Sequence, residues 1–257
     1  MKIDRKKVIK AFNDYVGEFD EKDEMIRLKK LHTVNVANIC ERIGESIGLD
    51  AFELDLCWFI GMMHDIARFI QYAAFGTFND AKSVDHAELG CQLLFEEKLL
   101  DTFIDYNEED KIILDFIENA IRYHSLYKLP EGLDETQRMY CNIIRDADKI
   151  DIFRVACEEP VESVYCYTED ELLNSTISPE VTKAFYEHHA IRRDLRHTPL
   201  DFKVGFLALS FELVYEKSRQ IALEQGYLLR IIYENYRDKT TVHQLEEMKK
   251  EVKNNLL

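Results

Sequence analysis

The sequence contains few residues that form turns, with 9 glycines and 4 prolines among 257 residues. A β-sandwich or β-barrel needs turn-forming residues after every short strand, so this scarcity argues against a many-stranded architecture. Hydrophobic residues make up 46% of the chain, which is enough to bury a sizeable core. We therefore expect an all-α protein, folded as one large domain or as a domain with an appended lobe.

Positive charge is also scarce, because 33 basic residues face 49 acidic residues and the formal net charge is −16. Such a charge opposes binding to long nucleic acids or to anionic membranes. A small anionic ligand stays compatible with it, since bound metal ions set their own local field. No apolar run is long enough to span a bilayer, and no apolar segment follows the basic N-terminus. We expect a cytoplasmic protein without a membrane partner, and the sequence leaves a homo-oligomer open.

The cysteines form no CxxC pair, which is the spacing typical of redox and zinc motifs. They are scattered through apolar segments with helical periodicity, and we interpret them as reduced core residues of a reducing compartment. These cysteines are Cys40, Cys57, Cys91, Cys141, Cys157 and Cys166.

Apolar residues at helical spacing predict helices along most of the chain. In the first part we expect them at about 8–16, 25–47, 50–70, 85–95, 111–123 and 135–157. Residues 50–70 are apolar nearly all round, which is typical of a central buried helix. The polar, glycine-containing stretch 71–83 predicts a loop.

The chain changes character after Pro160. We expect helices at roughly 179–195 and 199–236, followed by a polar tail from Val242. We therefore place a soft boundary near Pro160, which divides the chain into residues 1–160 and a smaller helical lobe, 161–257, packed on the first part.

A spaced series of metal-ligand residues is the most informative feature of the sequence. It consists of His32, the pair His64-Asp65, His86, His124 and an Asp within the run 145–151. An ionised Asp in so apolar a helix is costly unless it is paired, hydrogen-bonded or bound to a cation. Adjacent residues on a helix diverge by about 100°, so they can reach two neighbouring ions, with the carboxylate bridging them.

A second interpretation is that His64 and Asp65 form a hydrogen-bonded pair inside their helix. It is weaker because the other members of the series lie on separate predicted helices, and a helical bundle directs such side chains into one interior.

The series resembles the H…HD…D signature of the HD superfamily of metal-dependent phosphohydrolases. The matching elements are His32, the run Gly61-Met62-Met63-His64-Asp65-Ile66-Ala67 and the run Ala147-Asp148-Lys149-Ile150. His86 and His124 resemble the additional ligands of members that hold two metal ions. The resemblance covers about residues 25–160 and implies an HD-type helical bundle.

The resemblance also implies two divalent metal ions that share one carboxylate. The ligands of the first ion would be His32, His64, Asp65 and Asp148, and those of the second would be Asp65, His86 and His124. Imidazole and carboxylate ligands suit Mn, Fe, Co, Ni or Zn without choosing among them.

The last ligand is taken from an acidic run. Asp146 and Asp148 cannot be equivalent, because two positions along a helix turn a side chain by about 200°. The resemblance favours Asp148, since the family's last ligand is usually the Asp of an Ala-Asp pair followed by a basic residue. Asp146 and Asp151 would then support the ligands or lie at the surface.

The reaction implied by the resemblance is hydrolysis of a phosphoester in a small phosphorylated molecule, such as a nucleotide, by a water that bridges the two ions. Arg68 and Lys82 are candidates for contacts to the substrate phosphate, although either could be a solvated charge or a salt-bridge partner. Two alternatives are a mixed-valent di-iron oxygenase of the same superfamily and a non-catalytic, metal-stabilised protein whose acidic surface binds a protein partner.

Overall fold

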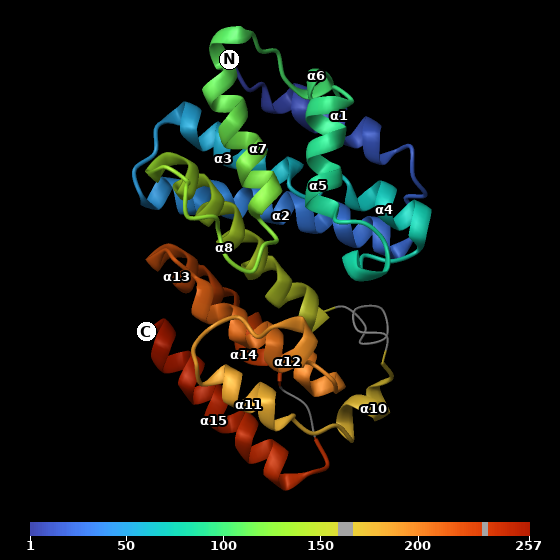
Figure 1. Cartoon of the computed structure of the whole chain (residues 1–257), viewed down its shortest axis with the longest axis vertical. Helices are drawn as coiled ribbons and strands as arrows, with labels where there is room; N and C mark the ends of the chain where they lie inside the picture. The colour runs from blue at the N-terminus through green and yellow to red at the C-terminus, as the bar shows by residue number, and fades with distance from the viewer. Residues whose placement is uncertain (159–166, 233–235) are drawn as a thin grey trace. The chain divides into compact units, whose positions relative to one another are not determined.

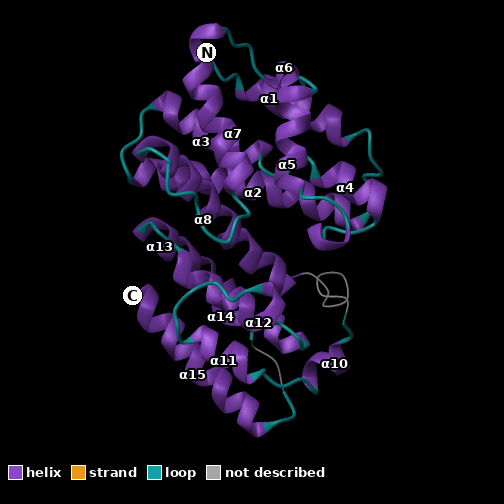
Figure 2. Ribbon diagram, viewed as in Figure 1, coloured by secondary structure: helices purple, strands orange, loops and turns teal. Residues whose placement is uncertain are grey.

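The computed structural model describes residues 1–158, 167–232 and 236–257 (Figure 1). Over these residues the chain is helical, and the only extended pairing is an isolated bridge between Lys2 and Asp105 (Figure 2). The all-α class expected from the composition is therefore confirmed. None of the described helices is both long and apolar enough to cross a bilayer.

The chain divides into two compact units, Met1–Ala147 and Asp148–Leu257. The division falls within one continuous helix, α8 (Glu135–Glu158), whose first half belongs to the first unit. The assignment of residues 1–160 and 161–257 as domains stays a prediction.

Seven helices and the first half of α8 form the first unit. They are α1 (Arg5–Val16), α2 (Glu24–Ser46), α3 (Ala51–Met63), α4 (Arg68–Phe75), α5 (His86–Cys91), α6 (Leu100–Phe103) and α7 (Lys111–Tyr123). A π-helical turn, Gln92–Glu96, continues α5, and 3-10 turns occupy Asp80–Lys82 and Glu108–Asp110. The predicted helices at 8–16, 25–47, 111–123 and 135–157 are thus confirmed to within a few residues.

Aspartates begin the first three helices. The side chains of Asp4, Asp23 and Asp50 each accept hydrogen bonds from two backbone N–H groups of the turn that follows. Such caps satisfy donors that have no partner within the helix and place negative charge at the positive end of its dipole. Part of the acidic excess therefore fixes where the helices start.

The predicted helix over 50–70 is wrong at its centre. The helix α3 ends at Met63, residues 64–67 form a turn, and α4 begins at Arg68. Within the turn the N–H of Ile66 donates to the carbonyl of Met63 at 3.1 Å, a bond of the tighter 3-10 type. His64 keeps right-handed helical backbone angles. Because residues 50–70 are apolar on every side, no shift of an apolar face along the sequence marks where α3 ends.

The predicted loop over 71–83 is also partly wrong, because α4 continues to Phe75. It ends at Gly76, whose φ of +64° is a left-handed conformation that favours glycine.

A glycine allows α2 and α3 to pack closely. A Cβ atom on Gly61 would lie 2.5 Å from the Cα of Ala37 in α2, far inside the contact distance. Because the backbones approach so closely at this point, the turn that follows α3 is held beside the middle of α2. His64 therefore comes close to His32, with ring centroids 5.4 Å apart.

The second unit contains the end of α8 and six shorter described helices. They are α10 (Glu169–Leu173), α11 (Pro179–Phe185), α12 (Pro199–Ala208), α13 (Glu216–Gln225), α14 (Tyr227–Arg230) and α15 (Lys239–Leu256). The predicted helix over 179–195 is wrong beyond Phe185. The one over 199–236 is interrupted by a 3-10 turn, Leu209–Glu212, by an extended Leu213 and by Gly226 at φ +72°.

The predicted polar tail is wrong, because residues from Lys239 onward form α15. Its buried side chains Leu245, Met248, Val252 and Leu256 lie at spacings of three and four and make one narrow apolar stripe. The many charged residues between them lowered the mean hydropathy and masked the stripe.

The described cysteines are free thiols, as expected. Cys40, Cys57, Cys91 and Cys141 are buried and Cys157 is half-buried. Cys166 lies outside the described residues.

Candidate metal centre

Four separate elements of the first unit direct buried side chains to one point. His32 lies in the middle of α2, His64 and Asp65 begin the turn after α3, His86 is the first residue of α5, and His124 directly follows α7. All five residues are at most 5% exposed. The structure therefore brings together imidazoles and a carboxylate that are far apart in the sequence.

The carboxylate of Asp65 lies between two pairs of histidines. Its Oδ2 atom is 3.6 Å from Nε2 of both His32 and His64. Its Oδ1 atom is 3.5 Å from Nε2 of His86 and 3.8 Å from Nε2 of His124. Each oxygen thus lies near two imidazole nitrogens, and the carboxylate and histidines form a cluster that could hold metal.

The other ring nitrogen of three histidines is bound to an oxygen. Nδ1 of His64 donates to the carbonyl of Gly61 at 2.7 Å, and Nδ1 of His124 donates to the carbonyl of Ile121 at 2.6 Å. Nδ1 of His86 donates to Oδ2 of Asp80 at 2.7 Å. Because these oxygens accept hydrogen bonds, the proton of each neutral ring lies on Nδ1 and the lone pair of Nε2 points toward Asp65.

The Nε2 atoms of His86 and His124 lie so close together that a cation between them would stabilise the pair. Their Nε2 atoms are 2.9 Å apart. Burial lowers the pKa of His86 to about 4 from its ordinary value of 6.5, although the hydrogen bond to Asp80 opposes the shift. With both rings neutral and both Nδ1 atoms protonated, two lone pairs face each other. A cation that accepts both removes this repulsion.

The separations fit ligands around divalent cations. Nitrogen and oxygen ligands lie about 2.1 Å from a transition-metal ion, so two ligands of one ion are about 3.0 Å apart at right angles and at most about 4.2 Å apart. The distances of 3.5, 3.6 and 3.8 Å from Asp65 to the histidines fall within this range, and the 2.9 Å between Nε2 of His86 and Nε2 of His124 lies at its lower end. Mixed imidazole and carboxylate donors are also the ligand set of Mn, Fe, Co, Ni and Zn.

The acidic run on α8 contributes to the same region. Asp148 follows directly on the last residue of the first unit and is half-buried. It forms, with His32 and His64, a group whose potential ligand atoms all lie within 4.8 Å of one another. Asp146 is fully buried but belongs to no such group among the described residues. Asp151 is also buried and accepts from Arg154 at 2.8 and 2.9 Å.

A lysine that the sequence analysis did not identify lies against the central carboxylate. Nζ of Lys29 donates to Oδ2 of Asp65 at 2.7 Å, and Nε of Arg68 donates to Oδ1 at 3.4 Å. Burial alone would raise the pKa of Asp65, but the charges of Lys29 and its other neighbours outweigh it and hold the pKa well below 3.8. The carboxylate is therefore ionised at neutral pH and available to a cation.

Lys29 could have been found from spacing alone. It lies three residues before His32 on the same helix, and residues at this spacing share a helix face.

Arg68 and Lys82, the predicted phosphate contacts, differ in their surroundings. Lys82 is exposed on the 3-10 turn Asp80–Lys82. Arg68 is only 9% exposed. Its Nη1 atom donates at 2.7 Å to Oδ1 of Asp80, to Oε1 of Gln71 and to the carbonyl of Phe78. The Nε and Nη1 atoms of Arg68 are therefore engaged within the protein.

A buried arginine holds the chain after α7. Nη1 of Arg145, on α8, donates to the carbonyl of Tyr123 at 3.1 Å, to that of His124 at 3.2 Å and to that of Leu126. Because one guanidinium collects these carbonyls, the backbone that carries His124 is tied to α8.

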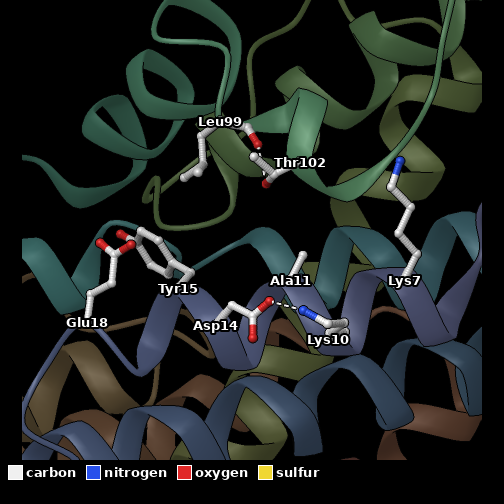
Figure 3. A pocket seen from close by; sticks show the side chains of 8 residues that line it. All are labelled: Lys7, Lys10, Ala11, Asp14, Tyr15, Glu18, Leu99 and Thr102. Atoms are coloured by element: carbon white, nitrogen blue, oxygen red, sulfur yellow. Dashed lines mark hydrogen bonds and ion pairs between the residues drawn. The ribbon is translucent and has the colours of Figure 1, made fainter.

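A cavity of about 420 Å³ lies elsewhere in the first unit, between α1 and residues 99–102 (Figure 3). Lys7, Lys10, Asp14 and Tyr15 line it from α1, and none of the centre's histidines does. One contact connects it to the centre, because the hydroxyl of Tyr15 donates at 3.0 Å to the carbonyl of Ile66 in the turn after His64-Asp65.

The comparison with known families agrees with this geometry. The model of the HD domain matches residues 31–152, a range that contains all six predicted ligands. No curated protein and no solved structure matches the chain.

Proposed function

Because the chain belongs to the HD superfamily, we propose that it is a metal-dependent phosphohydrolase that cleaves a phosphoester of a small phosphorylated molecule, such as a nucleotide. The observation that carries the proposal is the position of Asp65, whose two carboxylate oxygens each face a different pair of imidazole nitrogens at 3.5 to 3.8 Å. This arrangement suits two adjacent divalent ions with one shared ligand.

The proposed ligands follow from the same distances. One ion would be held by His32, His64, Asp65 and Asp148, and the other by Asp65, His86 and His124. The chemistry that two such ions supply is a water of lowered pKa as nucleophile and charge stabilisation of the phosphate oxygens.

Two hydrogen bonds orient the proposed ligands. The Nδ1 atoms of His64 and His124 donate to backbone carbonyls, which turns the Nε2 atom of each ring toward Asp65. Lys82, exposed near His86, is our proposed contact for a substrate phosphate. Arg68, whose Nε and Nη1 atoms also hold Asp65 and Asp80, is our second proposed contact for the substrate phosphate.

The net charge of −16 favours a small substrate over a polymer. A long polyanion would be repelled along its whole length, whereas a small phosphorylated molecule meets mainly the local field of the centre. We therefore propose that the partner is a small molecule and that neither nucleic acid nor membrane binds.

The test begins with elemental analysis of protein purified without added metal, followed by a screen of nucleotides and other phosphoesters with Mn²⁺. We expect two ions per chain and metal-dependent release of phosphate. Asp65→Ala should lose both the ions and the activity, because the carboxylate of Asp65 lies near histidines of both pairs. Asp115→Ala, at an exposed position of α7, is the matched control and should keep both.

The alternatives give different results in the same assays. Oxygen consumption by iron-loaded protein, without phosphate release, would identify the di-iron oxygenase. Bound metal without turnover of any phosphoester or uptake of oxygen would favour the non-catalytic protein, and either result would overturn the proposed hydrolysis.

A further inference from the structure

We propose that Asp80 is a positioning residue that prepares His86 for the second metal ion, and that loss of its carboxylate releases this ion selectively. The inference rests on the two-ion centre of the proposed function. It assigns a role to a residue of the segment between α4 and α5 that the ligand series does not include.

The need for such a residue follows from where each histidine lies. His64 and His124 each follow a helix, and their Nδ1 atoms donate to the backbone carbonyl three residues earlier, that of Gly61 or Ile121. His86 is instead the first residue of α5. No turn of its own helix precedes it, so a group from outside the helix must accept the Nδ1 proton.

Asp80 supplies that group. Its Oδ2 atom accepts from Nδ1 of His86 at 2.7 Å. A charged acceptor at this distance forms a strong hydrogen bond, fixes the tautomer and leaves the Nε2 lone pair for a cation. This lone pair points to the region between Oδ1 of Asp65 and Nε2 of His124, at 3.5 and 2.9 Å.

The carboxylate of Asp80 is itself held in place. Its Oδ1 atom accepts from Nη1 of Arg68 at 2.7 Å and from Nε2 of Gln71 at 2.9 Å. The same Nε2 atom also donates to the hydroxyl of Ser83 and to the carbonyl of Val84, both at 2.9 Å. Residues of α4 thus fix both the carboxylate and the segment that leads into α5.

An asparagine at position 80 cannot replace this carboxylate. His86, Arg68 and Gln71 all approach it as donors, on both oxygens. The side chain of Asn has one acceptor oxygen and one donor NH₂ group, so one of the two sides must lose its hydrogen bond. The volume is unchanged, which makes Asp80→Asn a test of hydrogen bonding rather than of packing.

A matched control is available five residues later. Asp85 is exposed and caps α5, accepting from the N–H groups of Ala87 and Glu88 at 2.9 and 3.1 Å. Asp85→Asn removes the same charge next to His86, and Asn is an equally good N-cap. A general effect of acidity near the centre would therefore appear equally in both variants.

The experiment is a calorimetric titration of the metal-stripped full chain with Mn²⁺. The wild type and Asp85→Asn should show two binding steps. Asp80→Asn should keep the first step, at His32 and His64, and weaken the second by about 10- to 100-fold, the usual effect of losing a hydrogen bond to a metal-bound histidine. A role confined to folding would weaken both steps together or lower the melting temperature of the metal-free variant.

Several outcomes would overturn the inference: two unchanged steps in Asp80→Asn, equal weakening of both steps, the same loss in Asp85→Asn, or only one step in the wild type. If Asp80→Asn does not fold, Gln71→Met replaces it. This variant keeps the contact of Asp80 with His86 but removes one of its supports, so it should weaken the second step alone by a smaller factor, and unchanged binding would count against the inference.

The titration separates this inference from the proposed function. Selective loss of the second step in a protein that hydrolyses no phosphoester would support the role of Asp80 and reject the hydrolysis. Metal-dependent hydrolysis with no effect of Asp80→Asn would do the reverse.

Discussion

The ammonium group of Lys29 lies 2.7 Å from Oδ2 of Asp65, on the carboxylate oxygen that faces His32 and His64. The lysine side chain is 16% exposed and the aspartate side chain 3% exposed, so the pair is shielded from water. A divalent ion bound to Oδ2 would have to share this oxygen with the ammonium or displace it. Lys29 therefore both stabilises the metal-free protein and opposes the first ion.

The first prediction follows from this competition. Lys29→Met should destabilise the metal-free protein, because it removes a cation that compensates the buried carboxylate of Asp65. Breaking a buried ion pair costs about 3–5 kcal/mol. The cost should be smaller here, because Arg68 still pairs with Asp65. Added Mn²⁺ should raise the melting temperature of the variant more than that of the wild type. Thermal unfolding with and without Mn²⁺ measures both effects.

Lys30→Met is the control for this prediction, because Lys30 pairs with Glu21 near the surface rather than with Asp65. An equal response of Lys29→Met and wild type to Mn²⁺ would show that the ammonium does not compete with the ion.

The second prediction concerns the close approach of α2 and α3. Gly61→Ala should lower the free energy of unfolding by about 1–3 kcal/mol, the usual cost of overpacking, because the new Cβ would meet the backbone of Ala37 at 2.5 Å. Separation of the helices should also weaken the first Mn²⁺ step. Urea unfolding and the Mn²⁺ titration measure these changes. Gly132→Ala, where a Cβ meets nothing within 4 Å, should alter neither quantity.

The third prediction concerns the arginine that ties His124 to α8. Arg145→Met should destabilise the protein by about 1–3 kcal/mol for each buried carbonyl left without a donor, and should weaken the second Mn²⁺ step through a less ordered His124. Arg138→Met, on the same helix, removes one bond to the carbonyl of Pro130 and should have a smaller effect. Binding of both ions as tightly as in the wild type would contradict this role of Arg145.

The fourth prediction concerns pH. Burial lowers the pKa of His86 from 6.5 to about 4, so between these values the unfolded chain binds a proton that the folded protein does not. The contribution of His86 to the stability of the metal-free protein is therefore fully present above about pH 6.5 and decreases as the pH falls toward 4, by up to about 1.4 kcal/mol for each pH unit.

Urea unfolding in the presence of a chelator checks this dependence. His86→Gln should show a smaller loss of stability on acidification than the wild type, whereas the exposed His243→Gln should behave as the wild type does. Identical slopes for all three proteins would show that another group is responsible.

Sequence patterns predicted the helices whose apolar stripe alternates clearly with polar residues. The helix α7 begins and ends at the predicted residues, Lys111 and Tyr123. The break at Met63 was missed, because a segment buried on all sides has no polar face from which a phase could be read. The helix α15 was missed for the opposite reason, since its apolar stripe is one residue wide among charged neighbours.

The candidate ligands could be named from the sequence because their residue types are unusual for a buried bundle. The residues that hold these ligands in place could not be named from the sequence, because their role depends on contacts between distant parts of the fold. Asp80 is an ordinary loop acid in the sequence, and its importance appears only when its carboxylate is found 2.7 Å from Nδ1 of His86. Arg68 was expected to contact a substrate phosphate, which stays a prediction, whereas its hydrogen bond to Asp80 could not be read from the sequence.

The histidines and Asp65 come from four elements that are separated by long stretches of chain: the middle of α2, the turn after α3, the start of α5 and the end of α7. A cation shared by them would act as a cross-link, comparable to a disulfide that closes several loops at once. A protease that cuts the exposed residues 105–109, between α6 and α7, would place His124 on a different fragment from the other four residues, and the fragments would stay together as long as the ion is bound. Chelation, rather than the cut itself, would release them.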